Sequence, residues 1–250
     1  MPMIEKGKFS QGDALVVGGS NGVGLAATLY LANYCKVYIV DRAVLNIDIP
    51  ANVELVQFDL LSGDFSLFNK FTTVDKLIIT AGFGRLSLFE NFSEEMIVQM
   101  MTVNATAVMR IIKHFYPKML GEKDFYTSVM VSIAGFMSSP FFAVYGASKA
   151  ALKIFIESIN VELLKNGTTN QILNVSPGSL KGTNFNGAAN DLSLLQSFIE
   201  EMISKMMNKE DLFIPQYEEV YKNVLARYAA DFRAEGAHSY EYKLKSGRLK

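Results

Sequence analysis

Short apolar runs recur along the first 180 residues, and segments of helical composition separate them. Runs of this kind, bounded by glycine or polar residues, predict buried β-strands. They occupy residues 14–18, 36–40, 53–58, 76–80, 128–135 and 171–176. Strands that alternate with helices are typical of a parallel sheet covered on both faces. We therefore expect an α/β fold: a single doubly wound Rossmann domain over residues 1–250, with a mostly parallel sheet and helices on both faces.

Two long helices are predicted by the spacing of apolar positions. Residues 96–119 form a methionine-rich stretch, and Ser93 is suited to cap its start. A second helix begins at Tyr145 and carries two apolar stripes on nearly opposite sides. The stripes are Leu152, Ile156, Ile159 and Leu163, and Ala147, Ala150, Ile154 and Val161. Such a helix needs two partners: one is the sheet, and the other is a neighbouring helix or a second subunit.

The pattern changes beyond residue 208. Residues 215–232 have the composition of a helix. In residues 239–245, Ser-Tyr-Glu-Tyr-Lys-Leu-Lys, bulky tyrosine and leucine side chains alternate with polar or charged ones. Alternation with a period of two predicts an edge strand here.

Composition narrows the class of protein. The 250 residues are half hydrophobic, enough to bury a sheet between helical layers, and the net charge of −1 gives no basic excess for nucleic acid. No apolar run is long enough to cross a bilayer, and residues 1–8 lack the apolar core of a signal peptide. The single Cys35 cannot form an intrachain disulfide, so a reducing, cytoplasmic location is the default expectation. His114 and His238 lack metal-ligand spacing, so we expect no metal site.

A glycine-rich run follows the first predicted strand. Gly18-Gly19-Ser20-Asn21-Gly22-Val23-Gly24 leads directly into a helical segment. Glycines allow a tight turn and let a pyrophosphate approach the helix N-terminus, where free N–H groups favour anions. The spacing Gly-x-x-x-Gly-x-Gly is a variant of the standard dinucleotide fingerprint. The alternative interpretation is a turn that only joins strand to helix.

The second predicted strand ends in Asp41-Arg42, about 20 residues beyond the glycine run. A carboxylate at this place can accept hydrogen bonds from an adenosine ribose and would repel a 2′-phosphate. NAD is therefore favoured over NADP. Arg42 weakens this preference, because a guanidinium can pair with a phosphate.

Tyr145 and Lys149 carry the candidate chemistry. At i and i+4 of one helix they share a face, and Ser132 lies thirteen positions upstream of Tyr145. A phenol has a pKa of about 10. A nearby ammonium group lowers that pKa, so that the phenol can exchange a proton at neutral pH. A serine hydroxyl nearby can hold a substrate oxygen against the phenol. The alternative is an exposed helix pair without chemistry.

These motifs together resemble the classical short-chain dehydrogenase/reductase family. The resemblance covers about residues 12–185 and rests on Gly18…Gly22-Val23-Gly24, Thr80-Ala81-Gly82, Asn104, Ser132, Tyr145…Lys149 and Pro177-Gly178. Val17 stands where the family often has threonine, and Ile79-Thr80-Ala81-Gly82 replaces its usual Asn-Asn-Ala-Gly. The family's Val-Asp-Gly-Gly ending is absent.

The resemblance implies a role for each position. Tyr145 moves the proton, Ser132 holds the substrate oxygen, and Lys149 binds the nicotinamide ribose while lowering the pKa of Tyr145. Asn104 completes a proton relay. The cofactor-binding residues would be Gly18, Ser20, Asn21, Gly22, Val23, Gly24, Asp41, Arg42, Asp59, Leu60, Ala81, Gly82, Tyr145, Lys149, Pro177 and Gly178. Among these, Asp59 and Leu60 would flank the adenine.

The resemblance also implies features outside the motifs. Residues 192–207 would form a mobile helical lid over the substrate, within a divergent region at 186–250. Thr183 lies one position later than the family's commonest spacing, so a pyrophosphate contact by Thr183 is not expected. Family members commonly pair two long helices across a twofold axis, and we expect a homotetramer, with a dimer as the second choice.

The predicted function is that of an NAD(P)-dependent oxidoreductase, which interconverts a small secondary alcohol and a ketone. One alternative is a cofactor-binding sensor or scaffold, which needs the glycine run but not the four catalytic residues. Another is a nucleotide-sugar epimerase-type enzyme. The glycine spacing and the lack of a large C-terminal substrate domain argue against an epimerase-type enzyme.

Overall fold

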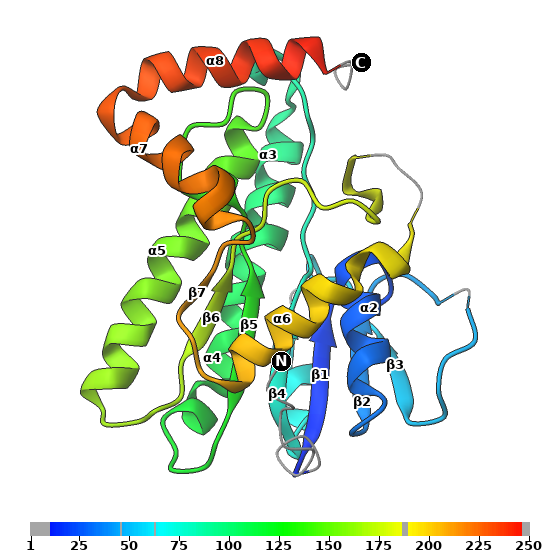
Figure 1. Ribbon diagram of the computed structural model, residues 1–250. Coiled ribbons are helices and arrows are strands. Elements are labelled where there is room, and N and C mark those ends of the chain that lie inside the picture. Colours follow the sequence, from blue (N-terminus) through cyan, green and yellow to red (C-terminus); the bar gives the residue numbers. More distant parts are fainter. Residues whose placement is uncertain (1–10, 46, 63, 187–189, 247–250) are drawn as a thin grey trace.

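The fold is built on a seven-stranded sheet in which every neighbouring pair of strands is parallel (Figure 1). The computed structural model describes residues 11–45, 47–62, 64–186 and 190–246. The strand order is β3-β2-β1-β4-β5-β6-β7. The strands are β1 Asp13–Val17, β2 Val37–Asp41, β3 Val53–Gln57, β4 Val74–Ile79, β5 Tyr126–Met130, β6 Ile172–Val175 and β7 Leu212–Phe213. The predicted doubly wound α/β fold is confirmed.

The fifth strand ends earlier than the sequence predicts. The apolar run extends to residue 135, but β5 stops at Met130 and residues 133–135 form a single 3₁₀ turn. The Ser132 side chain accepts a hydrogen bond from Ala134 N (3.2 Å), which caps this turn. The chain therefore leaves the sheet at Ser132.

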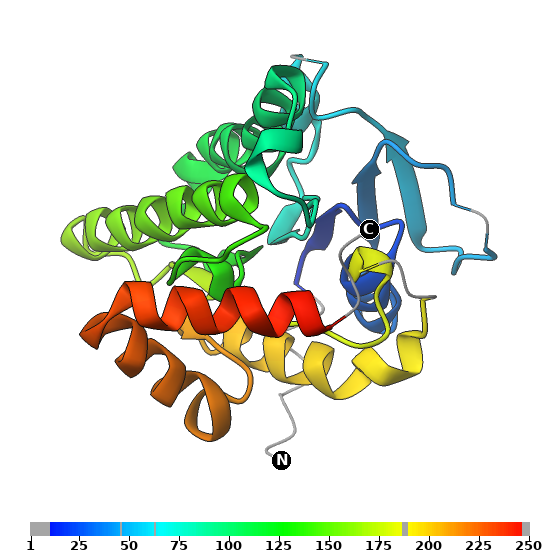
Figure 2. The ribbon, with the colours of Figure 1, turned by 90° about the horizontal axis from the view of Figure 1, so that it is seen from above.

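Two apolar layers enclose the sheet. On one face the 3₁₀ segment η1 (Phe65–Lys70), α4 (Ala107–Met119) and α5 (Ala143–Lys165) pack against the strands. On the other face lie α2 (Gly22–Leu31) and α6 (Gln196–Met207). Figure 2, seen from above, shows the two groups of helices on either side of the sheet. Because both faces of the sheet are buried, the sequences of the strands are continuous apolar runs.

The predicted methionine-rich helix is present but not regular. It consists of α3 (Glu94–Met101), a π-helical segment at Thr102–Thr106 and α4. Ser93 caps α3 as expected, because its side chain accepts a hydrogen bond from Met96 N at 3.2 Å. The π segment contains Asn104 and turns its side chain away from the helix, as described below.

Helix α5 shows both predicted stripes. Leu152, Ile156 and Leu163 are buried in the core and Ile159 packs against it. On the second stripe, Ile154 is 58% and Val161 57% exposed. The subunit that we expect to cover this stripe stays a prediction.

The prediction of a mobile lid at residues 192–207 is wrong. Helix α6 is part of the core, and its buried side chains are Ile199, Met202, Ile203, Met206 and Met207. Their spacing of three and four residues forms one apolar stripe, which lies on the sheet beside α2.

The prediction of an edge strand at residues 239–245 is also wrong. These residues belong to α8 (Phe232–Lys245), which follows α7 (Lys222–Ala230). Asp231 caps α8 by accepting hydrogen bonds from Arg233 N and Ala234 N, both at 3.0 Å. Arg227 of α7 donates two hydrogen bonds to Glu235 of α8, at 2.7 and 3.1 Å. The local alternation is overridden by this cap and by the pairing of two helices.

The α7–α8 hairpin lies over the carboxyl ends of the strands, at the top of Figure 1. In a parallel sheet, ligands bind at this edge.

Within the described ranges, no helix combines the length and the apolar character needed to cross a membrane. Cys35 is half-buried, and burial raises the pKa of its thiol. The expected cytoplasmic location stays a prediction.

Candidate active site

The glycine run forms a tight loop between β1 and α2. Gly18 has a φ of +85°, and a Cβ added to it would lie 2.5 Å from Ala81 N. A Cβ at Gly24 would overlap the carbonyl oxygen of Gly18. Thr80, one of the departures from the family pattern, supports the same loop by donating its hydroxyl to Gly18 O (3.1 Å). The loop is thus compact because three backbone segments approach without side chains between them.

Helix α2 begins at this loop. Its cap is Asn21, whose side chain accepts a hydrogen bond from Gly22 N at 2.8 Å. The first turn, which includes Val23 and Gly24, points its backbone N–H groups toward the carboxyl edge of the sheet. No acidic residue lies in this turn. The dipole and the N–H groups therefore make a suitable position for a phosphate group.

Asp41 lies at the end of β2 and is tied to the glycine loop. Its Oδ2 accepts hydrogen bonds from Ser20 N (3.1 Å) and Ser20 Oγ (2.6 Å). Its Oδ1 accepts from Ala43 N (3.1 Å). Arg42 is exposed beside it. Ser20, Asp41 and Arg42, which are predicted to contact the cofactor, thus lie together at the ends of β1 and β2.

Asp59 and Leu60 follow β3. Asp59 is exposed and its Oδ1 accepts a hydrogen bond from Leu61 N at 3.0 Å. Leu60 is buried in the apolar layer that contains Val40. Their predicted place beside an adenine stays a prediction.

Gly82 brings three of the predicted residues together after β4. A Cβ added to Gly82 would lie 3.1 Å from Asn104 Oδ1 and 3.3 Å from Lys149 Nζ. The Asn104 amide accepts a hydrogen bond from Phe83 N (2.9 Å) and donates to Phe83 O (2.8 Å). It also donates to Ser148 Oγ (3.1 Å). The π segment thus places Asn104 to fix both the segment after Gly82 and the first turns of α5.

Ser132 and Tyr145 meet beside Pro177. The Ser132 hydroxyl lies near the Tyr145 phenol and donates a hydrogen bond to Pro177 O (3.4 Å). Ile133 N donates to Pro177 O (3.0 Å), which holds the turn at Ser132 against the segment that continues to Gly178. Both side chains are buried, with 9% of Ser132 and 8% of Tyr145 exposed. Lys149 Nζ lies 5.7 Å from the centre of the Tyr145 ring. The four predicted catalytic residues therefore converge in space.

Burial dominates the proton affinities in this cluster. Lys149 donates a hydrogen bond to Met130 O (2.8 Å), and burial lowers the pKa of its ammonium group to about 7. Burial raises the pKa of Tyr145 to about 12, an effect that the polar Ser132 hydroxyl nearby partly offsets. The expected lowering of the Tyr145 pKa is thus not found here, because loss of solvent outweighs the polar contacts.

The structure adds residues that sequence reasoning missed. Phe142 and Phe185 place their rings 5.4 and 5.3 Å from the Tyr145 ring. Thr183 lies beside Gly22, at 3.7 Å from where a Cβ would be, although its spacing argued against such a place. Tyr221 rests its hydroxyl on Gly178. Phe142 belongs to an apolar stretch of the sequence at residues 136–144, whereas Phe185 and Tyr221 belong to no motif.

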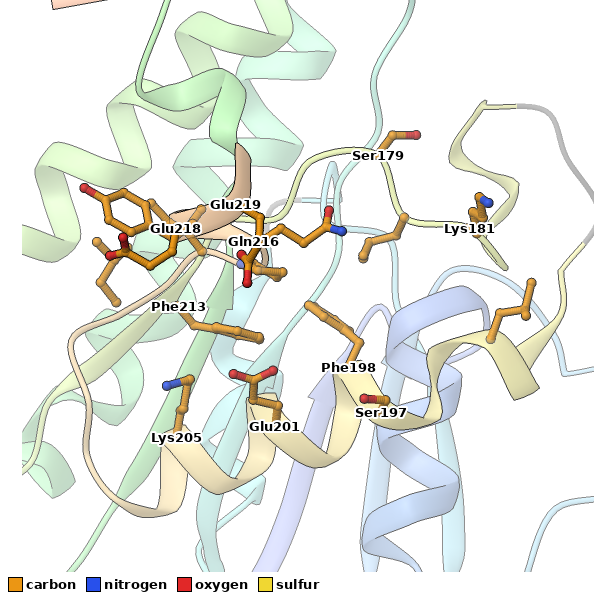
Figure 3. Close-up of a pocket in the computed structure, with 16 residues that line it drawn as sticks. Ser179, Lys181, Ser197, Phe198, Glu201, Lys205, Phe213, Gln216, Glu218 and Glu219 are labelled. Atoms are coloured by element: carbon orange, nitrogen blue, oxygen red, sulfur yellow. The ribbon is translucent and has the colours of Figure 1, made fainter. Parts of the chain in front are cut away.

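A cavity of about 740 Å³ lies between α6, β7 and the π-helical segment at Tyr217–Tyr221 (Figure 3). Its walls include Phe198, Phe213 and Gln216. None of the predicted site residues lines the cavity, although Ser179 and Leu180 connect it to Gly178. The convergence of the four polar residues, rather than this cavity, therefore defines the candidate active site. Among the described residues, no group of three or more His, Cys, Asp or Glu is arranged to hold a metal ion.

Comparison with known proteins agrees with the fold and the motifs. The sequence matches the short chain dehydrogenase family over residues 13–192, so the chain belongs to that family. It is 28% identical to the uncharacterized oxidoreductase TDA5 of Saccharomyces cerevisiae over 72% of this chain. The match spans 59% of the yeast protein's length.

Two solved structures illustrate the likeness in fold. A short chain dehydrogenase from Burkholderia cenocepacia, in complex with NADP, superposes with a TM-score of 0.74. It is 20% identical, and the match covers 92% of this chain and 98% of that one. A 4-hydroxyisoleucine dehydrogenase complexed with NADH and succinate has a TM-score of 0.62 at 20% identity, over 80% of this chain and 97% of that one.

We predict that Lys149 makes stability depend on pH. Its pKa of about 7 in the folded protein is below the ordinary 10.5, so the unfolded chain binds more protons between these values. The free energy of unfolding should therefore rise with pH from 7 to 9, and Lys149→Met should flatten that rise. Urea unfolding at pH 7, 8 and 9 measures it. The control is Lys153→Met, which removes an ammonium that pairs with Glu157. An unchanged slope in Lys149→Met would contradict the prediction.

Proposed function

We propose that the protein is an NAD(P)-dependent oxidoreductase that interconverts a secondary alcohol and a ketone. The observation that supports this function is the convergence of Ser132, Tyr145, Lys149 and Asn104 beside Gly82 and Pro177. The four polar residues come from three separate segments, the π segment, the turn after β5 and α5, and meet at the carboxyl edge of the sheet. A bound nicotinamide cofactor would supply or accept the hydride. The glycine loop, the α2 N-terminus and Asp41 form a cradle that fits such a dinucleotide.

Each polar residue of the cluster has a role in this proposal. The Tyr145 phenol gives or takes the proton, and the Ser132 hydroxyl holds the substrate oxygen against it. Lys149, with a pKa of about 7, is poised to exchange a proton near neutral pH. Asn104 fixes Phe83 and Ser148 and so holds the position of α5. Because Tyr145 and Lys149 are buried, water is kept away from the transfer.

The substrate class that suits this site is an apolar alcohol or ketone. Phe142 and Phe185 lie against Tyr145, and the two rings are 6.4 Å apart. A Cβ at Gly84 would come within 2.7 Å of Phe185. The approach to the phenol is thus bounded by aromatic rings and bare backbone, and a charged substrate would lose its hydration without a partner.

The cofactor is proposed to be NAD rather than NADP. One of the solved structures above contains NADP and the other NADH, so the likeness leaves the choice open. The Asp41 carboxylate already bonds Ser20 at the position where an adenosine ribose would lie. A 2′-phosphate placed there would meet a like charge at close range.

Tyr145→Phe should abolish turnover of ketones while leaving cofactor affinity within a few-fold. The ring still packs, but the proton donor is lost. Reduction of a panel of ketones, followed by the absorbance of the reduced cofactor, measures the change. Tyr116→Phe is the control, because that phenol bonds Glu162 away from the cluster. Near-normal turnover in Tyr145→Phe would remove this residue from the mechanism. Cofactor binding without turnover in the wild type would favour a sensor instead.

Asp41→Ala should narrow the preference for NADH. We expect the wild type to bind NADH at least tenfold more tightly than NADPH, a difference of about 1.4 kcal/mol. Fluorescence titration with both cofactors measures the two dissociation constants. Asp48→Ala, at an exposed position, should leave both unchanged. A wild type that prefers NADPH would instead assign the choice to Arg42.

The exposed stripe of α5 is proposed to be a subunit interface of a homotetramer or dimer. Ile154→Glu should dissociate the assembly, because a charge would be buried without a partner. Light scattering at micromolar concentration measures the mass. Ile47→Glu is the control; Ile47 is similarly apolar and 48% exposed but lies between β2 and β3. A monomeric wild type would disprove the interface.

A further inference from the structure

The loop at residues 136–142 is strained. Phe141 has a φ of +66°, a left-handed conformation that bulky side chains rarely adopt. It is nevertheless buried, with 5% of its surface exposed. A residue stays in such a conformation only when its surroundings hold it there. The contacts of this loop therefore show what keeps it in place.

Helix α8 supplies those contacts. The Tyr240 ring stacks on Phe141, with ring centres 4.6 Å apart. Lys243 Nζ donates hydrogen bonds to Ser139 Oγ (2.7 Å) and Pro140 O (2.8 Å). The same ammonium lies 5.5 Å from the centre of the Phe142 ring. Two side chains, one turn apart on α8, thus hold four consecutive residues of the loop.

The position of this loop is transmitted to Tyr145. Phe142 packs on Tyr145, and Phe142 O accepts the hydrogen bond from Gly146 N (2.7 Å) that begins α5. Phe141 O accepts from Ser87 N (2.9 Å), which ties the loop to the segment after Gly82. A shift of residues 139–142 would therefore move the aromatic wall beside Tyr145 and the first turn that carries it.

The hairpin contributes little to the core. Glu235 is the only buried side chain among the residues of α7 and α8, and its partner is Arg227. Tyr221, just before α7, rests on Gly178 at the other side of the site. The hairpin therefore touches both segments that border Tyr145, yet buries little apolar surface of its own. Its contacts fix the positions of neighbouring loops more than they stabilise the fold.

We propose that Lys243 and Tyr240 are positioning residues, which hold the 136–142 loop so that Phe142 and Tyr145 face the substrate. None of the contacts given above for these two residues involves the glycine loop, so cofactor binding should not depend on them. The catalytic consequence rests on the function proposed above. The structural consequence, that Phe142 is displaced when Lys243 or Tyr240 is replaced, does not rest on that function.

A tryptophan reporter tests the structural part without any substrate. The chain has no tryptophan, so Phe142→Trp introduces a single fluorophore at a half-buried position. In this background Lys243→Met should shift the emission to longer wavelength and raise acrylamide quenching at least twofold. Lys243→Arg keeps the charge and should restore most of the signal. Lys245→Met, on an exposed residue of the same helix, is the control.

Hydrogen exchange provides a second measurement on the native sequence. In Lys243→Met and in Tyr240→Leu, peptides that cover residues 136–146 should exchange faster, while those from β1 and α2 stay unchanged. This measurement decides the point if Phe142→Trp itself fails to fold. Unchanged exchange at 136–146 in both variants would overturn the proposal.

Kinetics with α-tetralone and cyclohexanone test the catalytic part. In Lys243→Met, kcat/KM should fall about tenfold and the dissociation constant for NADH should change less than twofold. Lys243→Arg should recover most of the activity, and Lys245→Met all of it. If the wild type reduces neither ketone, the proposed function fails at that point, whereas the fluorescence and exchange results still decide the role of Lys243. Displacement of the loop with unchanged kcat/KM would overturn the positioning role.

Discussion

The burial of the Lys149 side chain is the constraint on which the site depends. A buried amine must find hydrogen-bond partners, and Lys149 reaches Met130 O at the end of β5. That contact sets the distance between α5 and the sheet. Gly82 leaves the room that the amine requires, since a Cβ there would crowd both Lys149 and Asn104. Tyr145, one turn earlier on α5, is thereby directed toward Ser132.

The segments that form this site are fixed by polar contacts between backbone and side chains. Asn104 bonds Phe83 from the π segment, Ser132 caps the turn after β5, and Asp41 bonds Ser20 across the glycine loop. The first and third contacts join the end of one strand to a neighbouring segment, and the second shapes the end of β5 itself. Since all strands are parallel, these ends lie at one edge, and a few hydrogen bonds suffice to assemble groups from distant parts of the chain.

The C-terminal helices contact the loops around Tyr145. The hairpin packs on loops rather than on the sheet. Tyr240 stacks on Phe141, and the Lys243 ammonium group donates hydrogen bonds to the same loop. Just before the hairpin, the Tyr221 hydroxyl contacts Gly178. Such contacts stabilise a conformation of a loop more than they stabilise a fold. They are also the part of the molecule where the sequence departs from its family.

Sequence alone was sufficient for the parts of the protein that local patterns encode. Apolar runs buried on both faces predicted six of the seven strands. Gly18 and Gly24 marked the turn because a Cβ at either would overlap neighbouring backbone, and Gly22 because its φ of +49° favours glycine. Ser132, Tyr145 and Lys149 were recognisable because one helical turn and one strand end fix their relative places. The seventh strand, with two residues, is too short to leave a pattern.

Tertiary structure decided what depends on contacts between distant residues. Residues 239–245 alternate like a strand, but the Asp231 cap and the contacts of Tyr240 and Lys243 with residues about 100 positions away make them a helix. Residues 192–207 could be recognised as helical, yet only packing shows that they belong to the core. The pKa of Tyr145 rises rather than falls because burial is a property of the whole fold. Spacing along a chain determines which groups share an element, whereas solvent exposure and long-range partners exist only after the elements have packed.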